Sequence, residues 1–443
     1  MVFLKINELC EKHAALMNAC ADFAWKNPET GYREYKTSEY MEGEFLKLGY
    51  TVKRAENIPG FYADFDTGKD GPRLLVLAEL DALIASGHTC AVEGKAHACG
   101  HNAQLGAIVG VAAALKDENL TRDLVGSVRL CCVPAEEMIE GEYRRELIKE
   151  GKIKYQTGKR EFLHRGYFDG CDIAILVHAS EAFAVTRGNV GSIFKTVNYK
   201  GVPAHAGACP ELGVNALYAA NLGLSAVNAV RETFVDEDGL KFHAIITHGG
   251  ESANIIPDKI SLEAYVRGKD VSSILSVNKR INRALTGAAL AMGASVKIED
   301  FVSYFPLNCD GLLSDTVIEA AQHVIPEENI LLIDKHTPGS TDLGDLSALI
   351  PAVHPFSAGI SGAVHGNDFY IKDSERAVIK SAKLQLATVV LLLSNNAERA
   401  KKIIDGFNPK FKNKEELFAL VDDVSKKDVH IEYKGENEAR AVF

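Results

Sequence analysis

The period of the hydrophobic positions changes along the chain, and these changes outline the expected elements. Apolar residues recur at helical spacing over residues 6–26 and again after Thr37, whereas Arg73–Ala78 contains a continuous apolar run. Such a run is typical of a strand buried on both faces of a parallel sheet. Val128–Val133 and Asp172–Val177 are predicted as further strands, with helices between them. Strands that alternate with helices predict an α/β fold with a mixed, largely parallel sheet.

A different pattern begins near residue 189. Strands are expected over 193–199, near 241–247, over 258–267 and near 295–302, and the alternation of apolar and polar residues is cleanest over 258–267. Helical spacing returns over 213–232 and 271–292. The resulting order, strand–helix–strand–strand–helix–strand, is the ferredoxin-like (βαββαβ) arrangement. We therefore expect an inserted ferredoxin-like domain within a catalytic α/β domain. The predicted divisions are 1–188 with 304–395 for the catalytic domain, 189–303 for the inserted domain, and 396–443 for a C-terminal extension.

Composition narrows the class of protein. The 443 residues carry a formal net charge of −11, which disfavours nucleic acid or an anionic membrane as the main partner. No apolar run reaches the roughly 18 residues needed to span a bilayer, and the N-terminus does not resemble a secretory signal. The nine cysteines, an odd number, are scattered without a disulfide-like rhythm, so we expect a reducing, cytoplasmic setting. The absence of a CxxC pair disfavours structural zinc ribbons and zinc-dependent base deaminases. The basic segment 152–165 is interpreted as a solvated surface insertion.

Acidic and imidazole side chains follow three of the predicted strands. Asp81 comes after the first buried strand, Glu136 and Glu137 after the second, and His178 after the third. Ligands of open α/β sheets bind outside the carboxyl ends of the strands. The coincidence of these side chains at strand ends predicts an active site there.

Metal-binding residue types gather around this predicted site. Cys99 and His101 flank a glycine just before a helix, and a thiolate with an imidazole suits zinc, with manganese, cobalt or nickel as alternatives. Of the adjacent pair Glu136 and Glu137, one can bind metal while the other acts as general base. His365 adds a further imidazole after the inserted domain. Each signal alone has a structural explanation, but together they suffice for two metals that share a bridging ligand.

Other catalytic chemistries have weaker support. The chain has no G-x-S-x-G elbow, and Cys99 and His101 are too close in sequence to form a good nucleophile and base pair. It also has neither GxGxxG nor a P-loop, so nucleotide binding is unsupported.

Several motifs of the chain resemble those of one enzyme family. The sequence is similar to the di-metal amidohydrolase family that includes aminoacylases, carboxypeptidase G and auxin-conjugate hydrolases, and most of all to its p-aminobenzoyl-glutamate hydrolase and β-alanyl-dipeptidase branch. The similarity lies in a series of motifs that recur in the family's order. They are Glu79–Leu83, His97–Asn102, Pro134–Glu137, Ala204–Pro210, Ser252–Pro257, Gly339–Asp342 and Val364–Gly366.

The resemblance implies roles for individual residues. Glu136 would be the general base, and Asp81 would orient a metal ligand. His205 would reach into the partner's active site in a dimer and polarise the scissile carbonyl. Asn254 and Arg267 would bind substrate, with Arg267 pairing to a carboxylate. The metal ligands would be Cys99 as the bridge, His101, Glu137, His178 and His365.

Local structural roles are also open for His205, Asn254 and Arg267: a turn cap, a loop anchor and a surface charge. The predicted function is hydrolysis of the amide bond of N-acyl or N-aminoacyl amino acids that carry a free carboxylate. It would use two divalent metal ions, zinc or manganese first, in a homodimer joined by the inserted lid domain. The alternative is a catalytically silent binding protein on the same fold.

Overall fold

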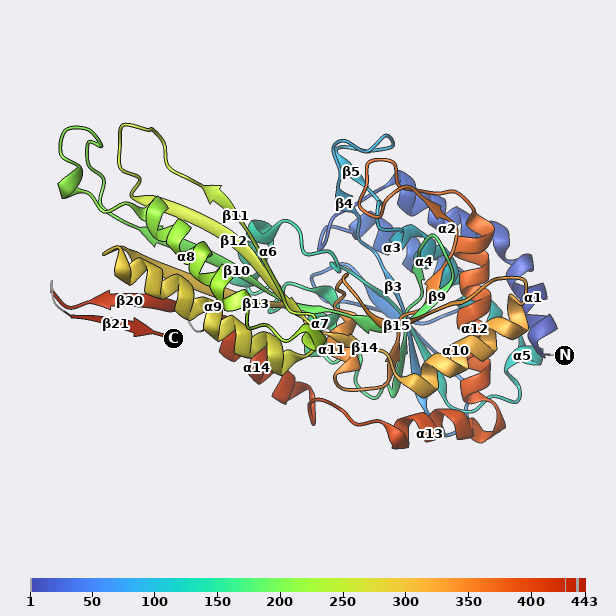
Figure 1. Cartoon of the computed structure of the whole chain (residues 1–443). Helices are drawn as coiled ribbons and strands as arrows, with labels where there is room; N and C mark the ends of the chain where they lie inside the picture. Colours follow the sequence, from blue (N-terminus) through green and yellow to red (C-terminus); the bar gives the residue numbers. More distant parts are fainter. Residues whose placement is uncertain (1, 427, 436–437) are drawn as a thin grey trace. The chain divides into compact units, whose positions relative to one another are not determined.

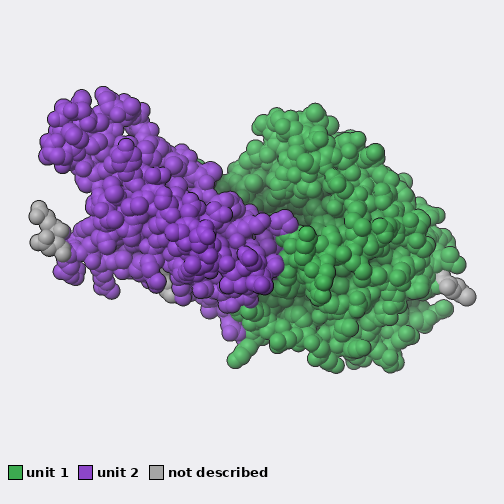
Figure 2. All heavy atoms as spheres, in the orientation of Figure 1, with its two compact units in different colours: residues 1–188, 308–337, 345–412 green, residues 189–307, 338–344, 413–443 purple. Residues whose placement is uncertain are grey.

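The computed structural model describes residues 2–426, 428–435 and 438–443 (Figure 1). The chain divides into two compact units, coloured separately in Figure 2. Unit 1 comprises Met1–Gly188, Asn308–Thr337 and Asp345–Lys412, and unit 2 comprises Asn189–Leu307, Pro338–Gly344 and Asn413–Phe443.

A six-stranded sheet forms the centre of unit 1. Its strand order is β1 (Val52–Arg54), β2 (Phe61–Asp66), β6 (Ser127–Val133), β3 (Arg73–Glu79), β7 (Ile173–Ile175) and β16 (Ala352–Val353). Strand β3 runs parallel to both β6 and β7, and β7 is parallel to β16, whereas β1, β2 and β6 pair antiparallel. The prediction of an α/β fold with a mixed sheet that contains parallel strands is therefore confirmed.

Helices surround this sheet, and one of them, α4 (His101–Ala114), is buried at every residue. It packs against α2 (Ala14–Lys26) at very short range, because a Cβ on Gly106 would lie 2.6 Å from the Met17 carbonyl oxygen. The single helix predicted over residues 6–26 is divided at His13 into α1 (Val2–Lys12) and α2. Other helices of this unit are α3 (Tyr35–Lys47), α6 (Gly141–Lys149), α7 (Gly158–His164), α10 (Gly311–Val324), α12 (Lys380–Leu393) and α13 (Glu398–Gly406).

The segment 152–165 contradicts its interpretation as a solvated surface insertion. It contains α7, in which Lys159 and Arg160 have no exposed side-chain area. Lys159 pairs with Glu79, and Arg160 pairs with Asp345 at 2.6 Å. Buried charges are tolerated when they are paired in this way. The interpretation was wrong because these acidic partners are remote in sequence from the basic run.

Unit 2 is built on an antiparallel sheet against which helices pack. In chain order its first elements are β10 (Gly191–Lys200), α8 (Ala216–Arg231), β11 (Lys241–His248), β12 (Lys259–Gly268), α9 (Val271–Ala291) and β13 (Ser295–Tyr304). The strands lie in the order β11, β12, β10, β13, followed by β20 (Val429–Tyr433) and β21 (Ala439–Val442). Alternate side chains of β12 are buried, which matches the alternation in the sequence.

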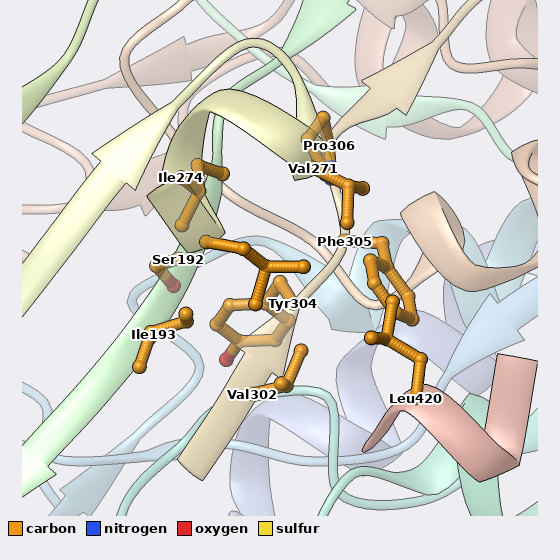
Figure 3. A pocket seen from close by; sticks show the side chains of 10 residues that line it. Ser192, Ile193, Val271, Ile274, Val302, Tyr304, Phe305, Pro306 and Leu420 are labelled. Carbon is orange, nitrogen blue, oxygen red and sulfur yellow. The ribbon is translucent and has the colours of Figure 1, made fainter. Parts of the chain in front are cut away.

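Residues 396–443 do not form one separate extension. Helix α13 belongs to unit 1, whereas α14 (Lys414–Lys426), β20 and β21 belong to unit 2. Leu420 of α14 lines a small apolar cavity of about 10 Å³ together with Ile193, Ile274 and Val302 (Figure 3). The C-terminal segment therefore completes the core of unit 2.

Among the described residues, no single helix is long and apolar enough to span a bilayer. Only a bent pair, Glu375–Leu393 with Asn395–Gly406, meets the length and composition criteria, and most residues of α12 within it are buried in the protein.

Candidate metal centre and active site

The ends of the central strands bring the predicted site residues to one edge of the unit 1 sheet. Strand β3 ends at Glu79, two residues before Asp81, and β6 ends three residues before Glu136. His178 begins β8 (His178–Ala179), shortly after β7. Because β3, β6 and β7 are parallel neighbours, their carboxyl ends meet at the same edge.

A glycine turn directs Cys99 and His101 toward a common point. Gly100 has φ 87°, a left-handed conformation that favours glycine, and α4 begins directly after it. An added Cβ at Gly100 would also lie 3.1 Å from the Cβ of Ala179. The conformation and the close packing both favour glycine between the two side chains.

Cys99 lies at the centre of the predicted ligands. Its Sγ is 3.4 Å from Nε2 of His178 and 3.4 Å from Nε2 of His365, and the latter atom is 3.1 Å from Oε1 of Glu137. The ligand atoms form two groups, Cys99 with His101 and His178, and Cys99 with Glu137 and His365. Within each group they lie within 4.8 Å of one another. The structure thus brings all five side chains together, with Cys99 shared.

The donor atoms fit divalent metal ions. Nε2 of His101 and Oε1 of Glu137 are buried, and neither has a hydrogen-bond partner among the described residues. Buried polar atoms without such a partner call for an explanation, and a bound ion is one. A thiol, imidazoles and a carboxylate are also the ligands that zinc and similar metals take.

Backbone carbonyls set the orientation of two histidines. His101 Nδ1 donates to the Asp81 carbonyl oxygen at 2.9 Å, and His178 Nδ1 donates to the Ala179 carbonyl oxygen at 2.8 Å. With these protons on Nδ1, as the hydrogen bonds indicate, each Nε2 keeps its lone pair for a metal. The Asp81 carboxylate lies 3.2 Å from His101 Nδ1 and accepts the Glu137 backbone N–H at 2.8 Å. Asp81 therefore positions both His101 and Glu137.

The turn before the two glutamates is strained. Ala135 has φ 56°, a conformation that non-glycine residues rarely adopt. It is held by the Glu34 carboxylate, which accepts the Ala135 N–H at 2.8 Å, and by the Gly158 N–H, which donates to the Ala135 carbonyl at 3.1 Å. This turn directs the buried Glu136 and Glu137 from the end of β6.

Burial controls the ionisation of the site. It raises the pKa of the Cys99 thiol well above the ordinary value, and the nearby Glu137 raises it further. Metal binding reverses this effect, since a coordinating thiol loses its proton. His97 is buried outside both ligand groups, and burial lowers its pKa to about 3, so it stays neutral.

Glu79 is an acidic residue of the candidate site for which no role was predicted. Glu79 forms a third group with His101 and Glu136, with ligand atoms within 4.8 Å of one another. Burial opposes its ionisation, but Lys159 and His101 outweigh burial and hold the pKa of Glu79 below its usual range. The sequence offered one signal, since Glu79 and Asp81 are two residues apart at a strand end. Nothing in the sequence indicated Lys159.

The three remaining predicted residues lie in unit 2. His205 is exposed, and its Nδ1 accepts the backbone N–H groups of Gly207 and Ala208 at 3.2 and 3.1 Å. The Ala206 N–H donates to the Asn254 carbonyl at 2.9 Å, which joins the loops that carry His205 and Asn254. Arg267 is half-buried and donates to Ser340 Oγ at 3.0 Å. The roles of these residues toward substrate stay predictions.

Comparison with known proteins identifies the family. The model of peptidase family M20/M25/M40 matches residues 62–390. The chain is 28% identical to a mouse (Mus musculus) Xaa-Arg dipeptidase over 93% of this chain and 91% of that protein. It is 27% identical to one component of the p-aminobenzoyl-glutamate hydrolase of Escherichia coli (strain K12), over 73% of this chain and 64% of that protein.

Solved structures agree on the fold. A putative aminohydrolase from methicillin-resistant Staphylococcus aureus superposes with a TM-score of 0.74 at 21% identity, over 88% of this chain and all of that one. A dinuclear metal-binding M20 peptidase from Bacillus subtilis gives a TM-score of 0.66 at 22% identity, over 86% and 98%. None of these relatives supports the silent-binding alternative. The predicted resemblance and the predicted hydrolysis of amide bonds in acyl or aminoacyl amino acids are confirmed: the chain belongs to peptidase family M20/M25/M40.

Proposed function

We propose that unit 1 binds two divalent metal ions, zinc or manganese, through Cys99, His101, Glu137, His178 and His365, and hydrolyses the amide bond of N-acyl or N-aminoacyl amino acids. The observation that carries this proposal is the position of Cys99, whose Sγ belongs to both groups of ligand atoms. A ligand shared by two groups fits a two-metal site, in which the ions lie only about 3.5–4 Å apart. The names of the relatives, a dipeptidase and a p-aminobenzoyl-glutamate hydrolase, support the substrate class.

The residues around the site have distinct tasks in this reaction. When bound, the two ions would lower the pKa of a bound water and polarise the scissile carbonyl. The buried Glu136 carboxylate takes a proton from the attacking water and delivers it to the leaving amine. Asp81 keeps His101 and Glu137 in place through the contacts described above. His205 polarises the carbonyl, and Asn254 and Arg267 hold the substrate.

A panel of substrates tests this function. It contains N-acyl amino acids, dipeptides and p-aminobenzoyl-glutamate, each offered to the metal-loaded protein. We expect hydrolysis of at least one class, its loss on chelation, and its return when metal is restored. Stoichiometric metal without hydrolysis anywhere in the panel would instead support a silent binding protein.

Unit 2 is proposed to be a ferredoxin-like lid that also forms a homodimer. Its sheet has two edges, and β20 and β21 cover the side of β13. At the other edge, β11 exposes Ile245 and Ile246 to 63% and 46%. Long, apolar edge strands are usually protected by pairing or by charges. A second copy of the chain at β11 would provide that protection.

Substituting Ile245 by glutamate should therefore convert the dimer to a monomer, because a charge would face the apolar interface. Light scattering coupled to size-exclusion chromatography measures the change. The same substitution at Leu332, which is 66% exposed in unit 1, serves as the control and should leave the dimer intact. A monomeric wild type, or an Ile245 variant that stays dimeric, would rule out this interface.

Substituting Arg267 by methionine should raise KM about 10–100-fold for substrates with a free carboxylate, since charge-assisted hydrogen bonds contribute about 1.5–3 kcal/mol. Steady-state kinetics with the matching C-terminal amides provides the comparison, because those substrates lack the carboxylate and should show little change. Lys259→Met removes an exposed cation from the same strand as a control. An equal effect of Arg267→Met on acids and amides would refute the clamp.

We also propose that the protein works in the cytoplasm. All nine cysteines are free in the structure, which supports a reducing, cytoplasmic setting.

A further inference from the structure

A buried ion pair lies next to the predicted ligand His101. Lys159 Nζ donates to Glu79 Oε1, and the two side chains have exposed fractions of 0% and 1%. Gly158 makes this approach possible: a Cβ there would lie 1.5 Å from the Pro134 carbonyl oxygen, so α7 begins against the turn that leads to Glu136. The pair therefore connects α7 to the edge of the sheet where the predicted ligands meet.

Glu79 is within reach of the ions that the site is proposed to hold. Its Oε2 lies 3.0 Å from Nε2 of His101, the nitrogen left for a metal, and the approach is not a hydrogen bond. A metal on that nitrogen would attract the carboxylate, because carboxylates are ordinary ligands of zinc and manganese. Nevertheless, both oxygens of Glu79 have other partners. Gln104 Nε2 donates to Oε2 at 2.8 Å, and Lys159 donates to Oε1.

Arg160, the residue after Lys159, shows that a buried cation in α7 need not contact the candidate metal centre. Arg160 is equally buried, and it pairs with Asp345, which belongs to none of the groups of possible metal ligands among the described residues. Two adjacent buried cations thus have different surroundings. Arg160 stabilises the packing of α7, whereas Lys159 contacts a carboxylate beside the candidate metal centre.

We propose that Lys159 is a positioning residue that, together with Gln104, restrains the Glu79 carboxylate and keeps it out of the metal coordination. This inference rests on the proposed function, because it requires a metal on His101. The restraint leaves a coordination position free for the attacking water. Without Lys159, the Oε1 side of Glu79 loses the partner that holds it, and the carboxylate turns toward the metal.

The test compares the wild type with Lys159→Met, the control Arg160→Met and the double variant Lys159→Met/Glu79→Gln, all loaded with cobalt(II). Visible absorption reports the coordination of cobalt, metal analysis gives the stoichiometry, and thermal unfolding of the metal-free proteins reports stability. We expect Lys159→Met to keep its metal, to show a weaker cobalt absorption typical of a higher coordination number, and to lose at least tenfold in kcat with little change in KM.

The double variant should restore the wild-type spectrum, because an amide is a poorer ligand than a carboxylate. Arg160→Met should lose thermal stability but keep the wild-type spectrum. An unchanged spectrum in Lys159→Met, or a changed spectrum that Glu79→Gln does not reverse, would overturn the proposal. A wild type that binds no metal would instead refute the proposed function, so the two failures are distinguishable.

Discussion

Replacing Glu136 by glutamine is expected to lower kcat by about 10²–10⁴-fold, the usual contribution of a general base, while the bound metal is retained. Glutamine keeps the size of the side chain but cannot accept a proton from water. Glu136 follows the strained Ala135 turn and belongs to neither of the two groups that share Cys99, but it lies beside His101 in the third group. Turnover measured beside the metal content of the same preparation gives both quantities.

Glu146→Gln is a suitable control, since Glu146 is exposed on the nearby helix α6 and should tolerate the change. Near-normal turnover in Glu136→Gln would remove the general-base assignment. Loss of metal from that variant would instead place Glu136 among the ligands.

Replacing Cys99 by alanine should abolish detectable activity and lower the metal content below two ions per chain. The shared Sγ is the atom by which both ligand groups are joined, so its removal affects both ions. Metal analysis after equilibration with zinc checks the stoichiometry. Thermal unfolding of the metal-free variant confirms that the fold persists.

Another buried cysteine provides the comparison for this variant. Cys20 is fully buried on α2, and burial raises its pKa to about 12, so it serves as an inert apolar side chain. Cys20→Ala should therefore keep both metals and its activity. A Cys99→Ala protein that still binds two ions would contradict the bridge.

The candidate site was largely predictable because its residues follow strong local signals. The buried runs before Asp81, Glu136 and His178 identify strand ends, and parallel strands bring such ends to one edge. The Cys99–Gly100–His101 turn is likewise local, since Gly100 permits the positive φ that begins α4. Short-range patterns therefore sufficed for these residues.

Lys159 was not predictable for the opposite reason. A run of basic residues is ordinarily solvated. Lys159 is instead buried, and the carboxylate that pairs with it, Glu79, is 80 residues away in sequence. The β20–β21 hairpin was missed on similar grounds, because β20 is stabilised by pairing with the remote strand β13. Both features depend on long-range contacts, which hydrophobic periodicity does not encode.

A two-metal centre bridged by Cys99 explains why its Sγ lies in both groups of ligand atoms. The most direct test is a crystal structure of the zinc-loaded protein with anomalous data collected at the zinc absorption edge. We expect two anomalous peaks in unit 1, each about 2.3 Å from Cys99 Sγ. One should lie beside His101 and His178, and the other beside Glu137 and His365. A single peak, or two peaks of which either lies beyond bonding distance of Cys99, would show that Cys99 does not bridge two metals.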